Sequence, residues 1–204
     1  MLKIALTGGI ATGKSYVLDR FRRRGVPCLD ADELAHGVTA AGTEATAAIA
    51  ARFGTEILAA DGSVDRRRLG PIVFADETAR RELEAIVHPA VFRAINAGVR
   101  AFELMGDAFA LVDVPLLYET GAEKNFDQVI VTACAPETQR ARLVERGLTD
   151  DAARQRLAAQ WPSERKTSRA DFVITTDGSF ADTDEQIARV MHSLKMSGFE
   201  DLRI

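Results

Sequence analysis

Residues 8–15 read Gly-Gly-Ile-Ala-Thr-Gly-Lys-Ser, and their types and spacing are those of a loop that binds nucleotide phosphates. They match the pattern G-x-x-x-x-G-K-[S/T] in full. Glycines such as Gly8 and Gly13 let the backbone approach a ligand closely, so that successive N–H groups point at phosphate oxygens. Lys14 would reach the β- and γ-phosphates, and the Ser15 hydroxyl would bind Mg²⁺. The predicted chemistry is binding of a nucleoside triphosphate with its magnesium ion.

The segments on either side of this loop are the ones that the motif requires. Residues 2–7 form a short, mostly apolar run, which predicts a buried strand. Val17, Leu18 and Phe21 share one face of the following segment, which predicts a helix that ends before Gly25. A strand, a glycine-rich loop and a helix in this order favour a phosphate-binding loop over a plain glycine-rich turn.

Carboxylates follow two further apolar runs. Asp30 and Asp32 come after residues 26–29, and Asp30 fits the capping position of the next helix. Asp32 either stabilises the first helical turn or faces the ligand crevice and accepts a proton from a substrate hydroxyl; the residues alone favour neither role. Asp113 follows the run 109–112, which has the form of the strand that lies beside a P-loop and carries a Mg²⁺-directed carboxylate.

Between these two strand ends the pattern is helical. Apolar residues recur at helical spacing in residues 45–53, 66–75 and 77–105. Pro89 interrupts the last stretch and predicts two helices there. The basic cluster at residues 66–68 fits either a solvated face or a ligand contact. A block of this length without a strand pattern predicts an inserted helical lobe for the substrate.

The strand pattern then resumes. Expected strands are residues 109–115, 128–133 and 172–174, expected helices are residues 136–146 and 183–195, and residues 196–204 are expected to form a tail. Residues 149–169 are polar and basic and contain the single tryptophan, Trp161. Such a helical segment between two strands either closes over the phosphates as a lid or stays a solvated helical hairpin.

Composition limits the class of protein. At 204 residues the chain can form one core with a small inserted lobe, and its formal net charge of −4 argues against a large polyanionic partner such as DNA. Cys28 and Cys134 show no metal-ligand spacing, so we expect reduced core thiols. The chain opens directly in a strand pattern, and no apolar run approaches the ~20 residues of a membrane span. We therefore expect a cytoplasmic protein without a signal peptide.

Taken together, these stretches resemble the dephospho-CoA kinases, a family of P-loop kinases. The Asp-Ala-Asp and Val-Pro-Leu-Leu stretches, in this order and spacing, are far more specific than the P-loop. Departures from the family pattern are Ala11-Thr12 for Gly-Ser, Tyr16 for a small hydroxyl residue, and Thr175-Thr176 for Asp-Asn. The matching residues are Leu6-Thr7-Gly8-Gly9-Ile10 with Gly13-Lys14-Ser15, Asp30-Ala31-Asp32 with Ala35-His36, Arg66 with Leu69 and Val73-Phe74, His88-Pro89, the run from Asp113 to Glu119, Gln139 with Arg142, Gln160, and Lys166 before Ala170-Asp171.

The resemblance implies an α/β fold of the P-loop NTPase type, with three layers and a five-stranded parallel sheet. It implies a nucleotide-binding core of residues 1–31, 108–148 and 170–204, a helical dephospho-CoA-binding domain of residues 32–107, and a lid of residues 149–169. It also implies transfer of phosphate from Mg·ATP to the ribose 3′-hydroxyl of dephospho-CoA, the last step of coenzyme A synthesis. ATP and dephospho-CoA are the expected partners, without nucleic acid or membrane, for a monomer or weak homo-oligomer.

The same resemblance implies roles for individual residues. The expected catalytic residues are Asp32, Lys14 and Arg142, and the expected metal ligands are Ser15 and Asp113. Expected ATP-binding residues are Gly8, Gly9, Ala11, Thr12, Gly13, Lys14, Ser15, Tyr16 and Arg142, and expected substrate-binding residues are Asp32, His36, Arg66, His88 and Leu116.

Three rival functions are compatible with a P-loop. Another small-molecule or nucleoside monophosphate kinase on the same scaffold is the nearest one. A GTP-hydrolysing switch is disfavoured because the chain has no Asn-Lys-x-Asp motif for guanine. A non-catalytic ATP-binding regulator is disfavoured because Lys14, Ser15 and Asp32 are all present.

Overall fold

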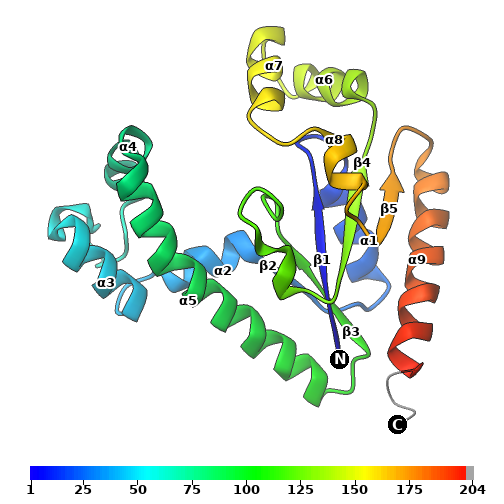
Figure 1. Ribbon diagram of the computed structural model, residues 1–204, viewed down its shortest axis with the longest axis horizontal. Helices are drawn as coiled ribbons and strands as arrows, with labels where there is room; N and C mark the ends of the chain where they lie inside the picture. The colour runs from blue at the N-terminus through cyan, green and yellow to red at the C-terminus, as the bar shows by residue number, and fades with distance from the viewer. Residues whose placement is uncertain (201–204) are drawn as a thin grey trace. The chain divides into compact units, whose positions relative to one another are not determined.

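The computed structural model describes residues 1–200, and side chains as far as residue 196. Strands alternate with helices, as the sequence pattern predicts (Figure 1). The strands are β1 (Leu2–Gly8), β2 (Cys28–Asp30), β3 (Phe109–Asp113), β4 (Gln128–Ala133) and β5 (Phe172–Thr175). The helices are α1 (Lys14–Arg23), α2 (Ala31–Val38), α3 (Glu44–Phe53), α4 (Arg66–Ala75), α5 (Glu77–Leu104), α6 (Pro136–Glu145), α7 (Asp150–Ala158), α8 (Ser163–Thr167) and α9 (Phe180–Glu200), with short 3₁₀ turns at Thr55–Ile57 and Ala122–Asn125.

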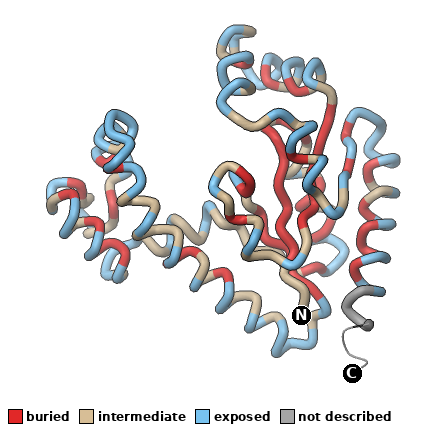
Figure 2. The backbone as a smooth tube through the Cα atoms, viewed as in Figure 1, coloured by how far each residue is buried: buried red, intermediate tan, exposed pale blue. Residues whose placement is uncertain are grey.

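The five strands form one sheet in the order β2-β3-β1-β4-β5, which confirms the predicted α/β class with a five-stranded parallel sheet. The central strand β1 pairs in parallel with β3 and with β4, and Leu6 is the register partner of both Asp113 and Ile130. Strand β3 is buried along its whole length, as Figure 2 shows for the sheet. Because the strands are parallel, their carboxyl ends share one edge, and the loop after β1 and the end of β3 meet there.

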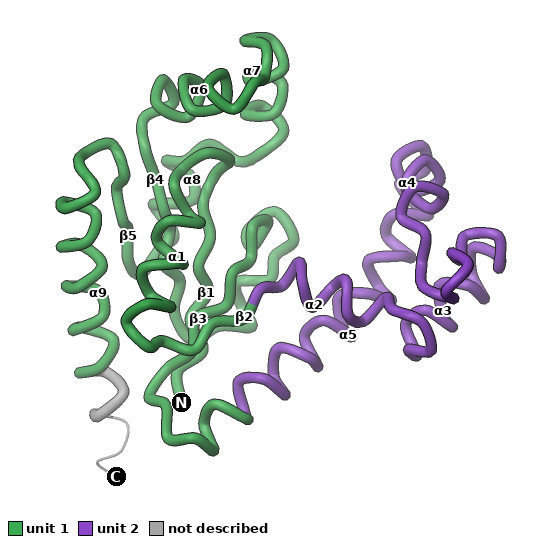
Figure 3. The backbone as a smooth tube through the Cα atoms, turned by 180° about the vertical axis from the view of Figure 1, so that it is seen from behind, with its two compact units in different colours: residues 1–29, 101–204 green, residues 30–100 purple. Residues whose placement is uncertain are grey.

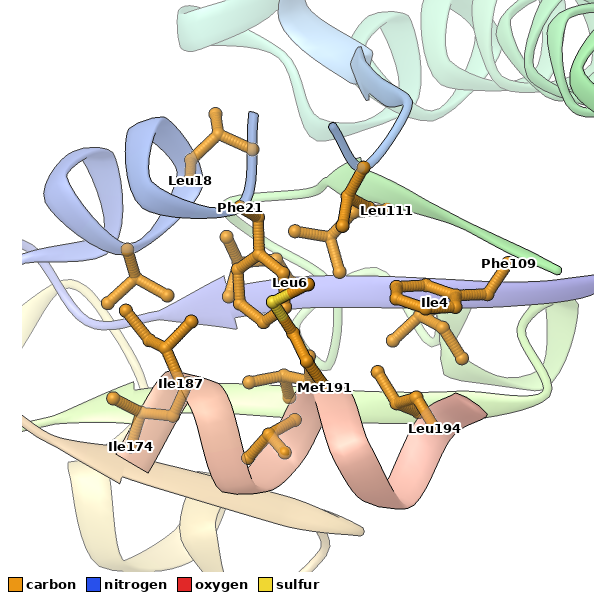
Figure 4. Packing of buried hydrophobic residues seen from close by; sticks show 14 residues of the cluster. Ile4, Leu6, Leu18, Phe21, Phe109, Leu111, Ile174, Ile187, Met191 and Leu194 are labelled. Carbon is orange, nitrogen blue, oxygen red and sulfur yellow. The ribbon is translucent and has the colours of Figure 1, made fainter. Parts of the chain in front are cut away.

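Helices α1 and α9 cover one face of the sheet. Figure 4 shows Phe21 of α1 and Ile187 and Met191 of α9 packed around Leu6 of β1. All four side chains are buried, and the three-or-four-residue spacing of the helical ones explains why these segments form helices against the sheet. This packing fixes the start of α1, which is the end that borders the glycine-rich loop.

Two compact units divide the chain (Figure 3). One unit contains residues 1–29 and the chain from residue 101 onward, with the sheet; the other contains residues 30–100 and is helical. The helical unit has its own core, in which Ile49, Ile57 and Leu69 are almost fully buried. Over residues 31–108, all within the described part, the only strand-like pairing is a single antiparallel bridge between Leu58 and Val64.

The predicted break at Pro89 is wrong: α5 runs through it as one helix of 28 residues. A proline inside a helix removes one hydrogen bond and costs about 3 kcal/mol. Apolar side chains on both sides of the proline offset that cost: Leu83 and Val87 before it are partly buried against the core of the helical unit, and Val91 and Ile95 after it are buried.

The last helix also differs from the prediction. A tail was expected from Met196, but α9 extends from Phe180 to Glu200; the rest of that expected tail, residues 201–204, lies outside the described residues. Leu194 is fully buried, so the sheet supports the helix close to its end. None of the helices within the described residues is both long and apolar enough to span a membrane.

Candidate functional site

The glycine-rich loop joins β1 to α1 and lines a cavity of 660 Å³. Gly13 has φ 81°, and Ala11 has φ 61°, the one described non-glycine residue with a left-handed backbone. An L-residue at Gly8 would place its Cβ 2.1 Å from the Thr132 hydroxyl oxygen, so no side chain fits there. The cavity is lined by Gly8, Gly9, Ile10, Ala11, Thr12, Gly13, Lys14, Ser15, Tyr16, Pro115, Arg142, Arg146, Gln160, Thr176, Gly178, Ser179, Phe180 and Thr183.

Thr12 supports the loop from beneath. Its side chain is buried, and its hydroxyl donates to the Gly9 carbonyl at 2.8 Å and lies 2.8 Å from the Thr132 hydroxyl. The Thr12 carbonyl accepts a hydrogen bond from the Thr176 hydroxyl at 2.9 Å. The hydroxyl therefore shapes the backbone instead of facing the cavity. Sequence reasoning missed Thr132 and Thr176, because nothing in a lone threonine on or after a strand signals such a contact.

Lys14 forms an ion pair with Asp113 at the end of β3. Both side chains are largely buried, at 17% and 8% exposure, and strand pairing brings them together because β1 and β3 are neighbours. Ser15 is exposed in the first turn of α1, where unpaired backbone N–H groups favour an anion. The arrangement offers a cation, a hydroxyl and a carboxylate beside helix N–H donors, which suits a phosphate group with a hard metal ion.

Arg142 reaches the loop from α6. Its guanidinium donates to the Ala11 carbonyl at 3.1 Å, to the Thr176 hydroxyl at 3.0 Å and to the Thr176 carbonyl at 2.5 Å. The side chain thus ties the loop after β1 to the segment after β5, while also lining the cavity. Its predicted catalytic role stays a prediction.

Aromatic side chains border the same cavity. The rings of Tyr16 and Phe180 lie 4.7 Å apart between centroids, and Phe180 is 73% exposed. The Tyr16 hydroxyl donates to Asp184, which also forms an ion pair with Arg20; that pairing holds the pKa of Asp184 below its usual range. Such a ring pair at a cavity edge can stack on a nucleobase.

The basic segment 149–169 divides into two differently anchored parts. In α7, Ala153 is fully buried and packs with Ala11 and Leu143, so this helix is not a fully solvated hairpin. After α7, Lys166 is fully buried and its ammonium lies 2.7 Å from the Glu119 carboxylate. The second part is therefore fixed to the loop after β3.

Trp161 strengthens that second anchor. Its ring stacks near Tyr118, with centroids 6.2 Å apart, and the Arg165 guanidinium lies 3.4 Å from its centroid. Burial and nearby Asp171 raise the pKa of Tyr118 to about 12, so its hydroxyl stays protonated and donates to the Arg169 carbonyl at 3.0 Å.

In the helical unit, Asp30 caps α2 as predicted, accepting from the backbone N–H groups of Asp32 at 2.8 Å and Glu33 at 3.2 Å. The Asp32 side chain is not used by the cap and is exposed in the first turn. His36 is exposed near the end of the same helix.

A second cavity, of 310 Å³, lies wholly within this unit. Its walls are mainly apolar, and Arg66 and His88, both predicted substrate residues, contribute to it. Leu116, the remaining one, belongs to the sheet-containing unit and is 45% exposed in the loop after β3.

Neither cysteine has the environment of a reactive or metal-binding thiol. Both are free, and burial raises the pKa of Cys28 to about 11 and that of Cys134 above its ordinary value. Within the described residues no cluster of three or more His, Cys, Asp or Glu side chains could hold a metal ion. A metal at the loop would therefore need ligands from a bound phosphate as well.

This chain is similar to known proteins over most of its length. The family model for dephospho-CoA kinase matches residues 2–193 of this chain. The dephospho-CoA kinase of Anaeromyxobacter dehalogenans is 48% identical over 180 residues, covering 88% of this chain and 85% of the relative. That of Geobacillus kaustophilus is 43% identical over 191 residues, covering 93% and 95%. The solved dephospho-CoA kinase from Campylobacter jejuni superimposes with a TM-score of 0.73 at 29% identity, covering 96% of this chain and 98% of that one.

Proposed function

This chain belongs to the dephospho-CoA kinase family, and from that premise we propose that it transfers the γ-phosphoryl group of ATP to the ribose 3′-hydroxyl of dephospho-CoA. The observation that carries the proposal is the loop of residues 8–15, which lines the 660 Å³ cavity and contributes Lys14 to its wall. Phosphoryl transfer needs positioning and neutralisation of charge more than covalent chemistry, and backbone N–H groups with a buried lysine supply both.

For the nucleotide, we assign the phosphates to the loop and to the first turn of α1. Lys14 would leave Asp113 for the β- and γ-phosphates, because a triphosphate offers it more negative charge than one carboxylate does. The base would lie toward Arg142, Tyr16 and Phe180, where the cavity is partly aromatic.

The residues present fit a magnesium ion that arrives with the nucleotide. The Ser15 hydroxyl and, through water, the Asp113 carboxylate would hold it, since Mg²⁺ prefers oxygen ligands and often keeps waters and substrate phosphates as the rest of its shell. When bound, the ion neutralises charge on the transferring phosphoryl group.

For the acceptor, we assign dephospho-CoA to the predicted helical domain of residues 32–107, most of which lies in the helical unit of residues 30–100. The apolar walls of the 310 Å³ cavity suit the pantetheine arm, and the Arg66 guanidinium suits the diphosphate of the acceptor. His36, His88 and Leu116 are assigned to the same substrate.

Asp32 is the assigned base. Its exposed carboxylate would accept the proton of the 3′-hydroxyl as that oxygen forms its bond to the γ-phosphorus and the bond from the γ-phosphorus to the departing ADP oxygen breaks. The cap formed by Asp30 leaves Asp32 free for this role, which supports the assignment.

The segment 149–169 is the proposed lid. Its first part, with exposed arginines on α7, would close onto the phosphates and exclude water, while its buried second part serves as the fixed end. We further propose a cytoplasmic monomer or weak homo-oligomer; the two free thiols support the reducing compartment.

Initial rates with several acceptors test the proposal. We expect the purified chain to form coenzyme A from ATP and dephospho-CoA only when Mg²⁺ is present, with AMP and shikimate at least about a hundredfold poorer acceptors. Mass spectrometry identifies the products. Comparable rates with AMP, or ATP hydrolysis without an acceptor product, would contradict it.

A further inference from the structure

Two glutamine side chains bind the backbone of one residue of the phosphate-binding loop, Ile10, whose N–H and C=O belong to consecutive peptide groups. The Ile10 N–H donates to Gln160 Oε1 at 2.8 Å, and the Ile10 carbonyl accepts from Gln139 Nε2 at 2.7 Å. Gln139 belongs to α6, and Gln160 follows the end of α7. Because a backbone N–H can only donate and a carbonyl can only accept, the orientation of each amide is fixed by its partner.

Gln139 has no room to take another position. Its side chain is 5% exposed, and the Ser163 hydroxyl donates to its Oε1 at 3.4 Å. A Cβ at Gly9 would lie 2.7 Å from Gln139 Nε2, so the glycine leaves the space that this amide occupies. The glycine at this position is therefore explained by Gln139 as well as by the approach of a phosphate.

Gln160 is held by its chain neighbour. The Trp161 N–H donates to Glu119 Oε1 at 3.2 Å, and the same oxygen lies 2.7 Å from the fully buried Lys166 ammonium. The Trp161 ring is stacked near Tyr118 and also contacts the Arg165 guanidinium. The Gln160 backbone thus sits next to a buried ion pair instead of in a loose loop.

The two halves of the phosphate-binding loop differ in what holds them. Gly13 begins the helix, and its carbonyl accepts from the N–H groups of Tyr16 at 3.0 Å and Val17 at 3.2 Å. Ile10 and Ala11 lie outside any helix or strand, and Ala11 has a left-handed backbone that alanine adopts only when its surroundings impose it. In the first half the Thr12 N–H donates to the Gly9 carbonyl at 3.3 Å, and side chains supply the hydrogen bonds to Ile10.

We propose that Gln139 and Gln160 are paired positioning residues that hold the two peptide groups on either side of the Ile10 Cα, and with them the first half of the loop, in the geometry needed for phosphoryl transfer. The inference rests on the proposed kinase activity. It also makes the α7–α8 segment a direct support of the loop, because Gln160 connects the two.

The kinetic consequence is a split between turnover and nucleotide affinity. When the hydrogen bonds from Gln139 and Gln160 to Ile10 are lost, ATP can still bind at the N-terminus of α1, so the KM for ATP changes by less than about threefold. The transferring group loses its fixed geometry, so kcat falls by roughly tenfold to a hundredfold.

Isosteric glutamate variants at the two positions separate polarity from charge. Gln139→Glu replaces the donor with an acceptor that faces the Ile10 carbonyl, whereas Gln160→Glu keeps the acceptor for the Ile10 N–H. Both add one negative charge beside the backbone of the same residue, Ile10. We expect Gln160→Glu to retain at least about tenfold more kcat than Gln139→Glu.

Ala188→Glu, which adds one negative charge at an exposed position of α9 away from the loop cavity, is the charge control and is expected to keep wild-type kcat. Equal losses for Gln139→Glu and Gln160→Glu, or no loss for either, would overturn the proposal. Should Gln139→Glu fail to fold in a thermal melt, Gln139→Met removes the donor without adding charge and is expected to show the same loss of kcat at unchanged KM for ATP.

Hydrogen exchange tests the contact between Gln160 and Ile10 independently of any activity. Gln160→Met should speed exchange of the Ile10 amide by at least about tenfold over the wild type and over Ala188→Glu. Unchanged exchange would refute the positioning role of the glutamines even if the enzyme makes coenzyme A. Faster exchange in a chain that makes no coenzyme A would refute the proposed function but would still support the contact between Gln160 and Ile10.

Discussion

The cavity at the phosphate-binding loop and the cavity in the helical unit are lined by different kinds of groups. The larger one is lined by loop backbone and by polar side chains whose orientations are fixed, among them Thr176 and Arg142. The one in the helical unit has mainly apolar walls and an exposed aromatic, Phe74, at 89% exposure. Directional groups suit a charged group that must be held at one geometry, whereas apolar walls suit a long, flexible chain. Substitutions in the first cavity should therefore alter kcat, and those in the second should alter KM for the acceptor.

Asp32 is expected to be the strongest exception to this separation of kcat and KM effects. It belongs to the helical unit, but its predicted role is in phosphoryl transfer. Asp32→Asn should lower kcat by roughly 10²–10⁴, since the amide cannot take the proton of the 3′-hydroxyl, while the KM for dephospho-CoA changes little. Steady-state kinetics measures both constants.

Asp30→Asn is the control for Asp32→Asn, because asparagine caps a helix about as well as aspartate. Normal turnover in Asp32→Asn would mean that Asp32 only stabilises the first turn of α2.

Lys14→Ala tests the expected effect on kcat of substitutions in the loop cavity. We expect kcat to fall by roughly 10²–10³, because a positive charge aimed at the transferring phosphate is lost. The substitution also removes the ion pair that Lys14 forms with the largely buried Asp113, so the melting temperature should drop as well.

The double variant Lys14→Ala/Asp113→Asn should recover that melting temperature but not the turnover. Near-normal turnover in either variant would remove Lys14 from the mechanism.

Phe74→Ala tests the expected effect on the KM for dephospho-CoA of substitutions in the cavity of the helical unit. Its ring lines the smaller cavity but is 89% exposed, so the fold should be unaffected. We expect the KM for dephospho-CoA to rise roughly threefold to tenfold, as apolar contact with the pantetheine arm is lost, with the KM for ATP unchanged. Leu104→Ala, at a comparably exposed apolar residue outside that cavity, is the control. Equal effects of the two variants would argue against this binding site.

The smallest expected effect is the change in amide exchange of the proposed lid when both ligands bind. Saturating ATP and dephospho-CoA are expected to slow amide exchange in residues 150–158 severalfold, because closure would bring α7 onto the phosphates. Residues 163–167 should change less, because the buried Lys166 already fixes α8. Equal exchange with and without ligands would exclude a moving lid.

The loop, the sheet and α1 could be predicted from the sequence because local signals specify each of them. A full phosphate-binding motif between an apolar run and an amphipathic segment has few other solutions, and Asp30 gives a local capping signal. The break at Pro89 was mispredicted because a local rule was opposed by burial of Val91 and Ile95, which only the folded unit supplies.

The supports of the loop could not be predicted, because they join residues far apart in the chain. The contact between Thr12 and Thr132 spans 120 positions, and that between Ile10 and Gln160 spans 150. Neither threonine nor glutamine carries a motif that signals such a role. The pairing of Lys14 with Asp113 is the exception, since the strand order of this fold puts the two side by side.

The most direct test of the account is to determine where the transferred phosphate lies on the product. After the chain is incubated with Mg²⁺, ATP and dephospho-CoA, ³¹P NMR of the product should show one new phosphomonoester on the ribose 3′-oxygen, formed in equal amount to ADP. Free phosphate with unchanged dephospho-CoA, or a phosphate on any other atom of the acceptor, would contradict the account.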